Sequence, residues 1–343
     1  VSCAEGEDGR VYQGLIPFQI KRTNLKNLKK APVKIMMNVS QPDVVFDLAA
    51  IPNDGVGLAR EEFIIANAIG IHPLALLNLS KLKDKTAAAR IKKRIAGYSK
   101  PSEFFIDKLA SGVAMIGAAF YPNDVIIRFS DFKTNEYATL IGGKEFEPKE
   151  ENPMIGWRGA SRYYDPEFEP AFLLECEAMR RVRDEMGLTN VVPMIPFCRT
   201  PEEGKKVLAV MKKGGLVQGK NGLRVFVMVE IPSNVILADE FAKIFDGFSI
   251  GSNDLTQLTL GIDRDTTRLH GVSDERDPAV IKMIQQVIKT ARSRGVKIGI
   301  CGQAPSDYPE FAAMLVKAGI DSISLNPDSV LPTRLALTKT KKK

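Results

Sequence analysis

The sequence predicts an α/β protein in which eight parallel strands, alternating with helices, close into a (β/α)8 barrel, or TIM barrel. Three observations predict this fold. Eight short apolar runs alternate with long helical stretches, and each run is apolar at successive positions, as expected of strands covered on both faces. A length of 343 residues is also typical of such a barrel. The runs span residues 33–39, 55–59, 125–129, 191–196, 225–231, 247–250, 297–300 and 322–325.

An open, doubly wound parallel sheet is the alternative arrangement for the same runs. Its nucleotide-binding versions place a glycine-rich loop, GxGxxG or GxxxxGK[ST], directly after a strand. No such pattern follows any of the eight runs. The barrel is therefore the favoured interpretation.

Helix start and stop signals lie between the apolar runs. Thr200, Pro201 and Glu203 have the pattern of an N-cap, a first-turn proline and a capping-box glutamate. Glycine commonly ends helices, and it follows two other apolar stretches of helical period. Further helices are expected over residues 166–186, 277–294 and 309–318, the last two ended by Gly295 and Gly319.

The chain divides into three parts by composition. Residues 1–30 are expected to form a short strand pair followed by a polar, basic linker. Residues 31–338 carry the barrel, and a helical, lysine-rich insertion over residues 71–123 is expected to lie outside it. Residues 339–343 form a basic tail.

Composition and charge exclude few classes but disfavour several. The net charge is +7, of which the tail residues Lys339, Lys341, Lys342 and Lys343 supply four, leaving +3 for the rest. This balance, without interleaved basic and aromatic residues, disfavours nucleic-acid binding. No apolar run reaches the roughly 18 residues that a membrane span needs. The four cysteines are widely spaced and form no CxxC pair, so we expect no disulfide framework and a cytoplasmic protein.

Polar side chains follow several of the apolar runs at the point where each run ends. In a barrel of this kind, the carboxyl ends of the strands form the face that carries functional residues. The candidates in these positions and in the nearby loops are Arg60, Arg128, Arg158, Glu230, Ser252, Asn253, Asp254 and Cys301.

Each candidate also has a purely structural interpretation. An arginine after a strand is commonly a surface ion-pair partner, and Asn253 with Asp254 could form a turn or a helix cap. Cys301 could be a small buried hydrophobic residue. Glu230 is harder to explain in this way, because burying an unpaired carboxylate inside an apolar run is costly.

Taken together, the candidates are chemically coherent. Glu230 and Asp254 offer the hard oxygen ligands that Mg2+ prefers. The arginines are forked donors suited to carboxylate and phosphate groups, and Cys301 is a proton donor beside them. This set suits a small anionic, phosphorylated acid whose enolate must be stabilised.

Segments along nearly the whole chain resemble one family, the enzymes that interconvert pyruvate and phosphoenolpyruvate through a phosphohistidine. Its members include phosphoenolpyruvate synthases, pyruvate phosphate dikinases and enzyme I of the sugar phosphotransferase system. The resembling segments keep the family's order and are GVGLAREEF (55–63), VIIRFSDF (125–132), NPMIGWRGASRY (152–163), VPMIPFCRT (192–200), VMVEIPSN (227–234), GFSIGSNDLTQLTLGIDRD (247–265), GICGQAPSD (299–307) and GIDSISLNPDSV (319–330). The stretches VSCAEGEDGRVY, DFKTNEY and GQAPSD most resemble the synthase branch.

The resemblance implies a barrel of the phosphoenolpyruvate/pyruvate type, dependence on Mg2+, and a homodimer. It implies the overall conversion of ATP, pyruvate and water to AMP, phosphoenolpyruvate and phosphate. By position, Glu230 and Asp254 resemble the Mg2+ ligands, and Cys301 resembles the residue that moves a proton at the methyl carbon of pyruvate. The positions that resemble substrate contacts are Arg60, Arg128, Gly251, Ser252 and Asn253.

One departure from the family pattern concerns histidine. The family carries its phosphoryl group on a histidine in a loop of Thr-x-His type, and neither His72 nor His270 lies in such a loop. We expect both to be structural or surface residues. We therefore expect the ATP-grasp and phosphohistidine domains to lie outside this chain, with residues 1–30 as the end of the latter. The alternatives are another member of the family, or a barrel that binds the ligand without catalysis.

Overall fold

The computed structural model describes residues 2–5, 8–11, 13–17, 25, 28–263 and 271–338. His270 and the lysine tail, for which the sequence made predictions, lie outside these residues. The chain forms two units, residues 1–30 and residues 31–343. The first unit contains the expected strand pair, an antiparallel hairpin of β1 (Ser2–Glu5) and β2 (Asp8–Val11).

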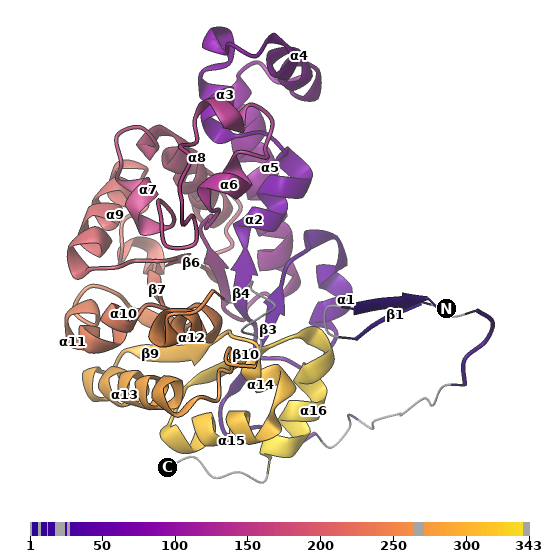
Figure 1. Cartoon of the computed structure of the whole chain (residues 1–343), viewed down its shortest axis with the longest axis vertical. Helices are drawn as coiled ribbons and strands as arrows, with labels where there is room; N and C mark the ends of the chain where they lie inside the picture. Colours follow the sequence, from indigo (N-terminus) through magenta and orange to yellow (C-terminus); the bar gives the residue numbers. More distant parts are fainter. Residues whose placement is uncertain are drawn as a thin grey trace. The chain divides into compact units, whose positions relative to one another are not determined.

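The second unit is a closed barrel of eight parallel strands, as predicted (Figure 1). Its strands follow one another around the barrel in chain order, and β10 closes it against β3. Each predicted apolar run coincides with one strand. The strands are β3 (Lys34–Val39), β4 (Val56–Arg60), β5 (Val125–Arg128), β6 (Val191–Ile195), β7 (Phe226–Val229), β8 (Gly247–Ile250), β9 (Lys297–Ile300) and β10 (Ser322–Leu325).

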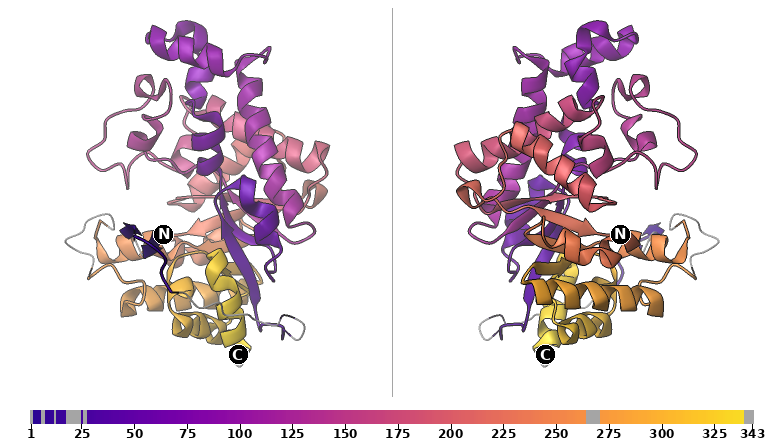
Figure 2. Two further views of the ribbon diagram at one scale, coloured as in Figure 1. Left: turned by 90° about the vertical axis from the view of Figure 1, so that its right-hand side faces the viewer. Right: turned by 90° about the vertical axis from the view of Figure 1, so that its left-hand side faces the viewer.

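Helices surround the strands on the outside (Figure 2). Those of eight or more residues are α4 (Lys85–Arg94), α5 (Pro101–Ala119), α8 (Glu169–Arg180), α9 (Pro201–Lys213), α12 (Ser252–Leu260), α13 (Pro278–Arg294), α15 (Pro309–Ala318) and α16 (Pro327–Leu337). Shorter turns of helix are α1 (Val45–Ala49), α2 (Glu61–Ile64), α3 (Pro73–Leu77), α6 (Thr134–Tyr137), α7 (Ala160–Tyr163), α10 (Pro232–Ile236), α11 (Ala238–Phe241) and α14 (Ala304–Asp307).

The predicted caps are present at three helices. Thr200 is the N-cap of α9, and its hydroxyl accepts a hydrogen bond from the Glu203 amide at 3.2 Å. The Glu203 carboxylate, expected to complete a capping box on Thr200, instead accepts from the Arg199 amide one residue earlier, at 2.6 Å. Gly295 and Gly319 end α13 and α15 with φ angles of 70° and 95°, where a side chain would be strained.

The insertion over residues 71–123 only partly matches its prediction. α3 and α4 lie beyond the strands at one end of this unit (Figure 1). α5, however, packs against α8 and β5, with Phe105 and Leu109 fully buried. The prediction that the whole insertion lies outside the barrel is therefore wrong for α5, whose apolar residues fill the layer between strands and helices.

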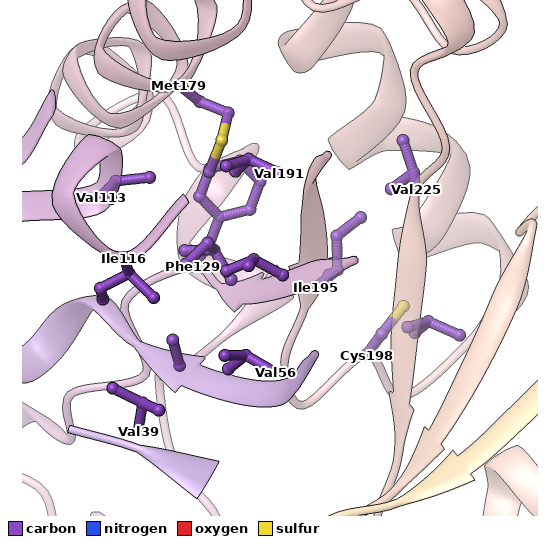
Figure 3. Packing of buried hydrophobic residues seen from close by; sticks show 14 of the residues in the cluster. Val39, Val56, Val113, Ile116, Phe129, Met179, Val191, Ile195, Cys198 and Val225 are labelled. Atoms are coloured by element: carbon purple, nitrogen blue, oxygen red, sulfur yellow. The ribbon is translucent and has the colours of Figure 1, made fainter. Parts of the chain in front are cut away.

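Alternate residues of each strand face two different cores. Residues on the outer side pack against the helices, and Figure 3 shows Val39, Val56 and Val191 of three strands beside Ile116 of α5 and Met179 of α8. The remaining side chains form a separate cluster that fills the barrel, namely Leu58, Ile126, Val192, Met194, Phe226, Met228 and Cys301. This alternation determines which side chains at the strand ends point into the barrel.

No helix in the described part of the chain is both long enough and apolar enough to cross a membrane.

Packing inside the barrel yields a stability prediction at Gly247. A Cβ atom at this position would overlap the ring of Phe226 on the neighbouring strand. We expect Gly247→Ala to lower the free energy of unfolding by about 1–3 kcal/mol, the usual cost of overpacking a filled core. Denaturant unfolding measures this loss. Gly271→Ala is the control, because its Cβ would have no neighbour within 4 Å, and equal stability of the two variants would contradict the prediction.

Candidate active site

The predicted site residues lie at the carboxyl end of the barrel, on the inner row of the strands. Arg60 and Arg128 are the last residues of β4 and β5 and are paired across the two strands. Leu58 and Ile126, whose side chains lie inside the barrel, stand two residues before Arg60 and Arg128. Since side chains alternate along a strand, both arginines lie on the inner face of the barrel strands. Glu230 has the same relation to Met228 of β7, and Cys301 itself belongs to the inner cluster. Strand alternation thus brings these four side chains to one face.

Glu230 is buried and only partly hydrogen-bonded. Its Oε1 accepts from the Phe197 amide at 2.6 Å, while its Oε2 has no hydrogen-bond partner in the described residues. Asn234 orients this segment, since its side-chain oxygen accepts from the Glu230 amide at 3.1 Å. Gly251 packs against the carboxylate, because a Cβ there would lie 2.8 Å from Oε2. Glu230 therefore offers one free oxygen to the interior of the site.

The pKa of Glu230 is raised to about 8. Burial is the largest cause, and the negative charges of Asp254 and Asp131 add to it. Arg128 and Arg158 act in the opposite direction but do not outweigh the other effects. The arginines therefore do not compensate for burial and the two neighbouring carboxylates together.

Arg128 is held by two acidic residues that the sequence analysis did not select. Its Nη2 donates to Glu62 Oε1 at 2.6 Å, and its Nη1 lies 3.5 Å from Asp131 Oδ2. Glu62 Oε1 also accepts from the Asp131 amide at 2.8 Å. Burial acts to lower the pKa of Arg128, but the charges of Glu62, Asp131 and Glu230 outweigh it and raise that pKa.

Arg158 lies in a loop after β5 and reaches the same site. Its Nε and Nη2 bond the two carboxylate oxygens of Asp131 at 3.0 and 2.6 Å. Its Nη1 donates to the Met154 carbonyl at 2.9 Å, and its guanidinium lies 4.1 Å above the ring of Phe197. Most of its donors are therefore engaged within the protein, and its role as a substrate contact stays a prediction.

Asp254 is brought to the site by the first turn of α12. It is buried, and its Oδ2 lies 3.6 Å from Arg158 Nη2. Its neighbours in that turn face elsewhere: the Ser252 hydroxyl donates to Glu275 Oε2, and the Asn253 amide lies 3.5 Å from Glu275 Oε1. Of the three consecutive polar residues, only Asp254 contacts the arginine network.

Cys301 is the first residue after β9, and its thiol is buried. Ser249 donates a hydrogen bond to its Sγ at 3.4 Å, and Sγ lies 3.6 Å from the Ile250 carbonyl. Burial raises the pKa of the thiol to about 11, and the charge of Glu230 also raises it. The Ser249 hydrogen bond and the charges of Arg128 and Arg60 favour the thiolate, but burial outweighs them.

Arg60 and His72 complete the sequence candidates in the described residues. Arg60 is exposed at the end of β4, with its guanidinium 4.4 Å above the ring of Phe63. His72 is fully buried, accepts from the Leu74 amide at 3.2 Å, and contacts Glu147 at 3.0 Å. The structural role predicted for His72 is therefore confirmed.

The acidic residues that the sequence analysis missed had a weak signal. Glu62 and Asp131 stand two and three residues after Arg60 and Arg128, close behind the apolar strands that those arginines end. A carboxylate so placed is commonly the partner of a buried arginine. Glu275 had no comparable signal, because it belongs to a polar segment between two helices.

The residues present fit a hard divalent cation with few protein ligands. Among the described residues, no group of three or more His, Cys, Asp or Glu side chains is arranged to hold a metal. Glu230 and Asp254 are two carboxylates, and Glu230 Oε2 lacks a hydrogen-bond partner. Mg2+ commonly keeps several waters and uses one or two carboxylates together with substrate oxygens.

A second pair of carboxyl groups, Glu61 and Glu175, is fully buried behind this network. Ser130 donates to both oxygens of Glu175, from its hydroxyl at 2.6 Å and its amide at 3.2 Å. Burial and mutual repulsion raise the pKa of Glu61, and burial raises the pKa of Glu175 to about 7. Two adjacent buried carboxyl groups are stable together when they hold a proton.

The chain is similar to known proteins over nearly its whole length. Residues 18–342 match the family described as PEP-utilising enzyme, PEP-binding domain. The chain is 61% identical over its whole length to phosphoenolpyruvate synthase of Synechocystis, covering 42% of that protein. The corresponding proteins of Aquifex aeolicus and Escherichia coli are 55% and 51% identical, with 45% and 43% of their lengths covered. The chain thus spans less than half the length of these relatives.

The buried acid pair yields a pH-dependent prediction. Between the ordinary pKa of 4.5 and about 7, folded Glu175 keeps a proton that the unfolded chain has lost. Its contribution is therefore fully present below pH 4.5, and the free energy of unfolding falls as the pH rises, by roughly 3 kcal/mol in all. In Glu175→Gln, an amide can donate permanently to Glu61, so we expect this dependence to flatten.

Denaturant unfolding between pH 4.5 and 7.5 measures this effect. Glu167→Gln, which changes an exposed carboxylate, serves as the control and should keep the wild-type slope. If Glu175→Gln also kept that slope, the pair would not be the site of proton uptake.

Proposed function

This chain belongs to the family of PEP-utilising enzymes, and we propose that it is the catalytic barrel of a phosphoenolpyruvate synthase. The reaction is the conversion of ATP, pyruvate and water to AMP, phosphoenolpyruvate and phosphate. The barrel binds pyruvate and transfers to it a phosphoryl group that arrives on a phosphohistidine. Other parts of the protein carry this histidine and an ATP-grasp domain. The resemblance also supports a cytoplasmic homodimer.

The observation that carries this proposal is the unequal charge at the carboxyl end of the barrel. Three arginines, Arg60, Arg128 and Arg158, stand at the site with four carboxylates, those of Glu62, Asp131, Glu230 and Asp254. The excess is negative, which agrees with the raised pKa of Glu230. A divalent cation would offset it, and the cation would in turn attract an anionic ligand.

Glu230 and Asp254 are the residues that would hold Mg2+. When bound, the ion supplies a Lewis acid that stabilises the enolate oxygen of pyruvate. The free Oε2 of Glu230 supports this assignment, since a buried oxygen without a donor is costly unless a cation or water satisfies it.

Arg60 and Arg128 would bind the transferring phosphoryl group. They end two neighbouring strands and are paired across them, so both guanidinium groups start from the same edge of the barrel. A planar fork suits the oxygens of a phosphoryl group. Arg128 is already oriented by Glu62 at 2.6 Å, which limits the side-chain entropy lost on binding.

Cys301 would transfer the proton at C3 of the ligand. In the direction of phosphoenolpyruvate synthesis, the Cys301 thiolate accepts a proton from the methyl carbon of pyruvate, which leaves the neutral thiol and the enolate. In the reverse direction, the thiol returns that proton to the methylene carbon. The raised pKa of about 11 suits the second step, because the sulfur keeps its proton until the enolate carbon takes it.

The metal assignment predicts a dependence of ligand binding on Glu230. We expect oxalate, a planar mimic of the enolate, to bind the chain only in the presence of Mg2+. Glu230→Gln should weaken metal-dependent binding at least tenfold, since a hard anionic ligand is lost while the amide oxygen can still accept from the Phe197 amide. Calorimetry with and without a chelator measures both effects. Unchanged oxalate affinity in chelator would exclude the assignment.

The role of Cys301 is tested by deuterium exchange into the methyl group of pyruvate, in a full-length protein that carries this barrel. We expect Cys301→Ala to slow exchange by on the order of 100-fold or more, the usual contribution of a general acid or base. Mg2+ and oxalate should still bind. Cys176→Ala is the matched control, because it removes the same atom from a buried position in α8. A wild-type exchange rate in Cys301→Ala would end this part of the proposal.

A further inference from the structure

Glu275 joins the segments that follow β8 and β9, here called the Asp254 loop (residues 251–254) and the Cys301 loop (residues 301–304), without belonging to either. It lies in the segment between α12 and α13, and its carboxylate is partly buried. One oxygen, Oε2, accepts from the hydroxyl of Ser252, the first residue of α12 after β8. The other, Oε1, accepts at 3.0 Å from the backbone amide of Ala304, the first residue of α14 after β9. Oε1 also lies 3.5 Å from the side-chain amide of Asn253.

Glycine at position 302 permits this arrangement. A Cβ atom there would overlap the Ser252 hydroxyl and would lie 2.8 Å from Glu275 Oε2. The backbone of the β9 loop therefore packs directly on the hydrogen bond between Ser252 and Glu275. The carboxylate also lies at the first turn of α12, a nine-residue helix whose positive end favours negative charge.

The two joined loops carry different parts of the proposed chemistry. Ser252 and Asn253 directly precede Asp254, the candidate metal ligand. Ala304 follows Cys301 by three residues in the next loop. The strands beneath are themselves joined by the hydrogen bond from the Cys301 amide to the Ile250 carbonyl at 3.0 Å. Glu275 adds a side-chain connection above the last strand hydrogen bond, where the backbone ladder has ended.

We propose that Glu275 is a positioning residue, which holds the Asp254 loop and the Cys301 loop at a fixed separation. This inference rests on the proposed function. Asp254 on one loop would help to hold the ion that stabilises the enolate oxygen, and Cys301 on the other would face the methyl carbon. Proton transfer requires the carbon and the sulfur to be in line, and a shift of about 1 Å can cost on the order of 100-fold in rate. Glu275 itself touches neither group.

A positioning role differs from a purely stabilising one in what its loss changes. Without Glu275, each loop retains its own residues and its own strand, so metal-dependent binding should persist. The distance between the loops is no longer maintained, and the proton-transfer step slows. A merely structural residue would instead affect binding and rate together, through the folded fraction.

The test compares Glu275→Gln with Ser252→Ala and with the double variant. Glutamine keeps the size of the side chain, but it presents only one acceptor oxygen and cannot accept from both loops. In a full-length protein carrying the barrel, we expect each single variant to slow deuterium exchange into pyruvate by about tenfold. The double variant should be no slower than the single ones, because both remove the same connection. Mg2+-dependent oxalate affinity should change by less than about threefold, well under the loss in rate.

Asp274→Asn provides the matched control. Asp274 is the neighbouring carboxylate, and it pairs with Arg276 at 2.8 Å rather than with Ser252 or Ala304. Its variant should exchange deuterium at the wild-type rate. Thermal unfolding of all variants, measured alongside, reports the folded fraction at the assay temperature.

Several outcomes would overturn the inference. A wild-type exchange rate in Glu275→Gln would do so, as would losses that multiply in the double variant. Equal losses of binding and rate, explained by a smaller folded fraction, would reduce Glu275 to a stabilising role. If the wild-type protein itself neither bound oxalate with Mg2+ nor exchanged deuterium, the proposed function would fail, which is a separate result.

Discussion

Charged groups taken out of water at the carboxyl end of the barrel must compensate one another, and the arrangement there depends on this constraint. The Asp131 carboxylate accepts two hydrogen bonds from the Arg158 guanidinium and lies 3.5 Å from that of Arg128. The Glu62 carboxylate accepts hydrogen bonds from Arg128 and from the Asp131 backbone amide. Removing one member would leave its partner as an uncompensated buried charge, a loss of about 3–5 kcal/mol. The loops after β4 and β5 are ordered by these bonds as well as by apolar packing.

The need to compensate buried charges also divides the polar residues of the site into two groups. Some have hydrogen-bond partners within the protein, and others keep an oxygen that a ligand could use. Arg158 and the Ser252 hydroxyl have partners within the protein. Glu230 keeps one oxygen without a hydrogen bond, although it is buried. Unsatisfied polar groups of this kind are rare in folded proteins and concentrate at functional sites. The proposed metal site therefore coincides with one of the positions where internal compensation is incomplete.

Backbone packing determines how closely the loops of the candidate site can approach one another. Gly251 and Gly302 lie against the carboxylates of Glu230 and Glu275, and a Cβ at either position would meet an oxygen 2.8 Å away. These glycines do not have positive φ angles, so close approach rather than backbone conformation is their function. Beyond the ends of β7, β8 and β9, hydrogen bonds to the carboxylates of Glu230 and Glu275 thus connect segments that backbone hydrogen bonds between strands no longer join.

The sequence by itself determined the eight strands, the ends of α13 and α15, and the position of Arg60, Arg128, Glu230 and Cys301 where strands end. These follow from period and capping, which are local properties of the chain. The family followed from the resemblance of whole segments to its members. Only the tertiary structure decided which candidates keep free donors or acceptors. Asp131 and Arg158 are 27 residues apart, and Ser252 and Glu275 are 23 apart. It likewise placed α5 in the barrel layer and buried Cys301, because pairing and desolvation depend on neighbours that the folded chain brings together.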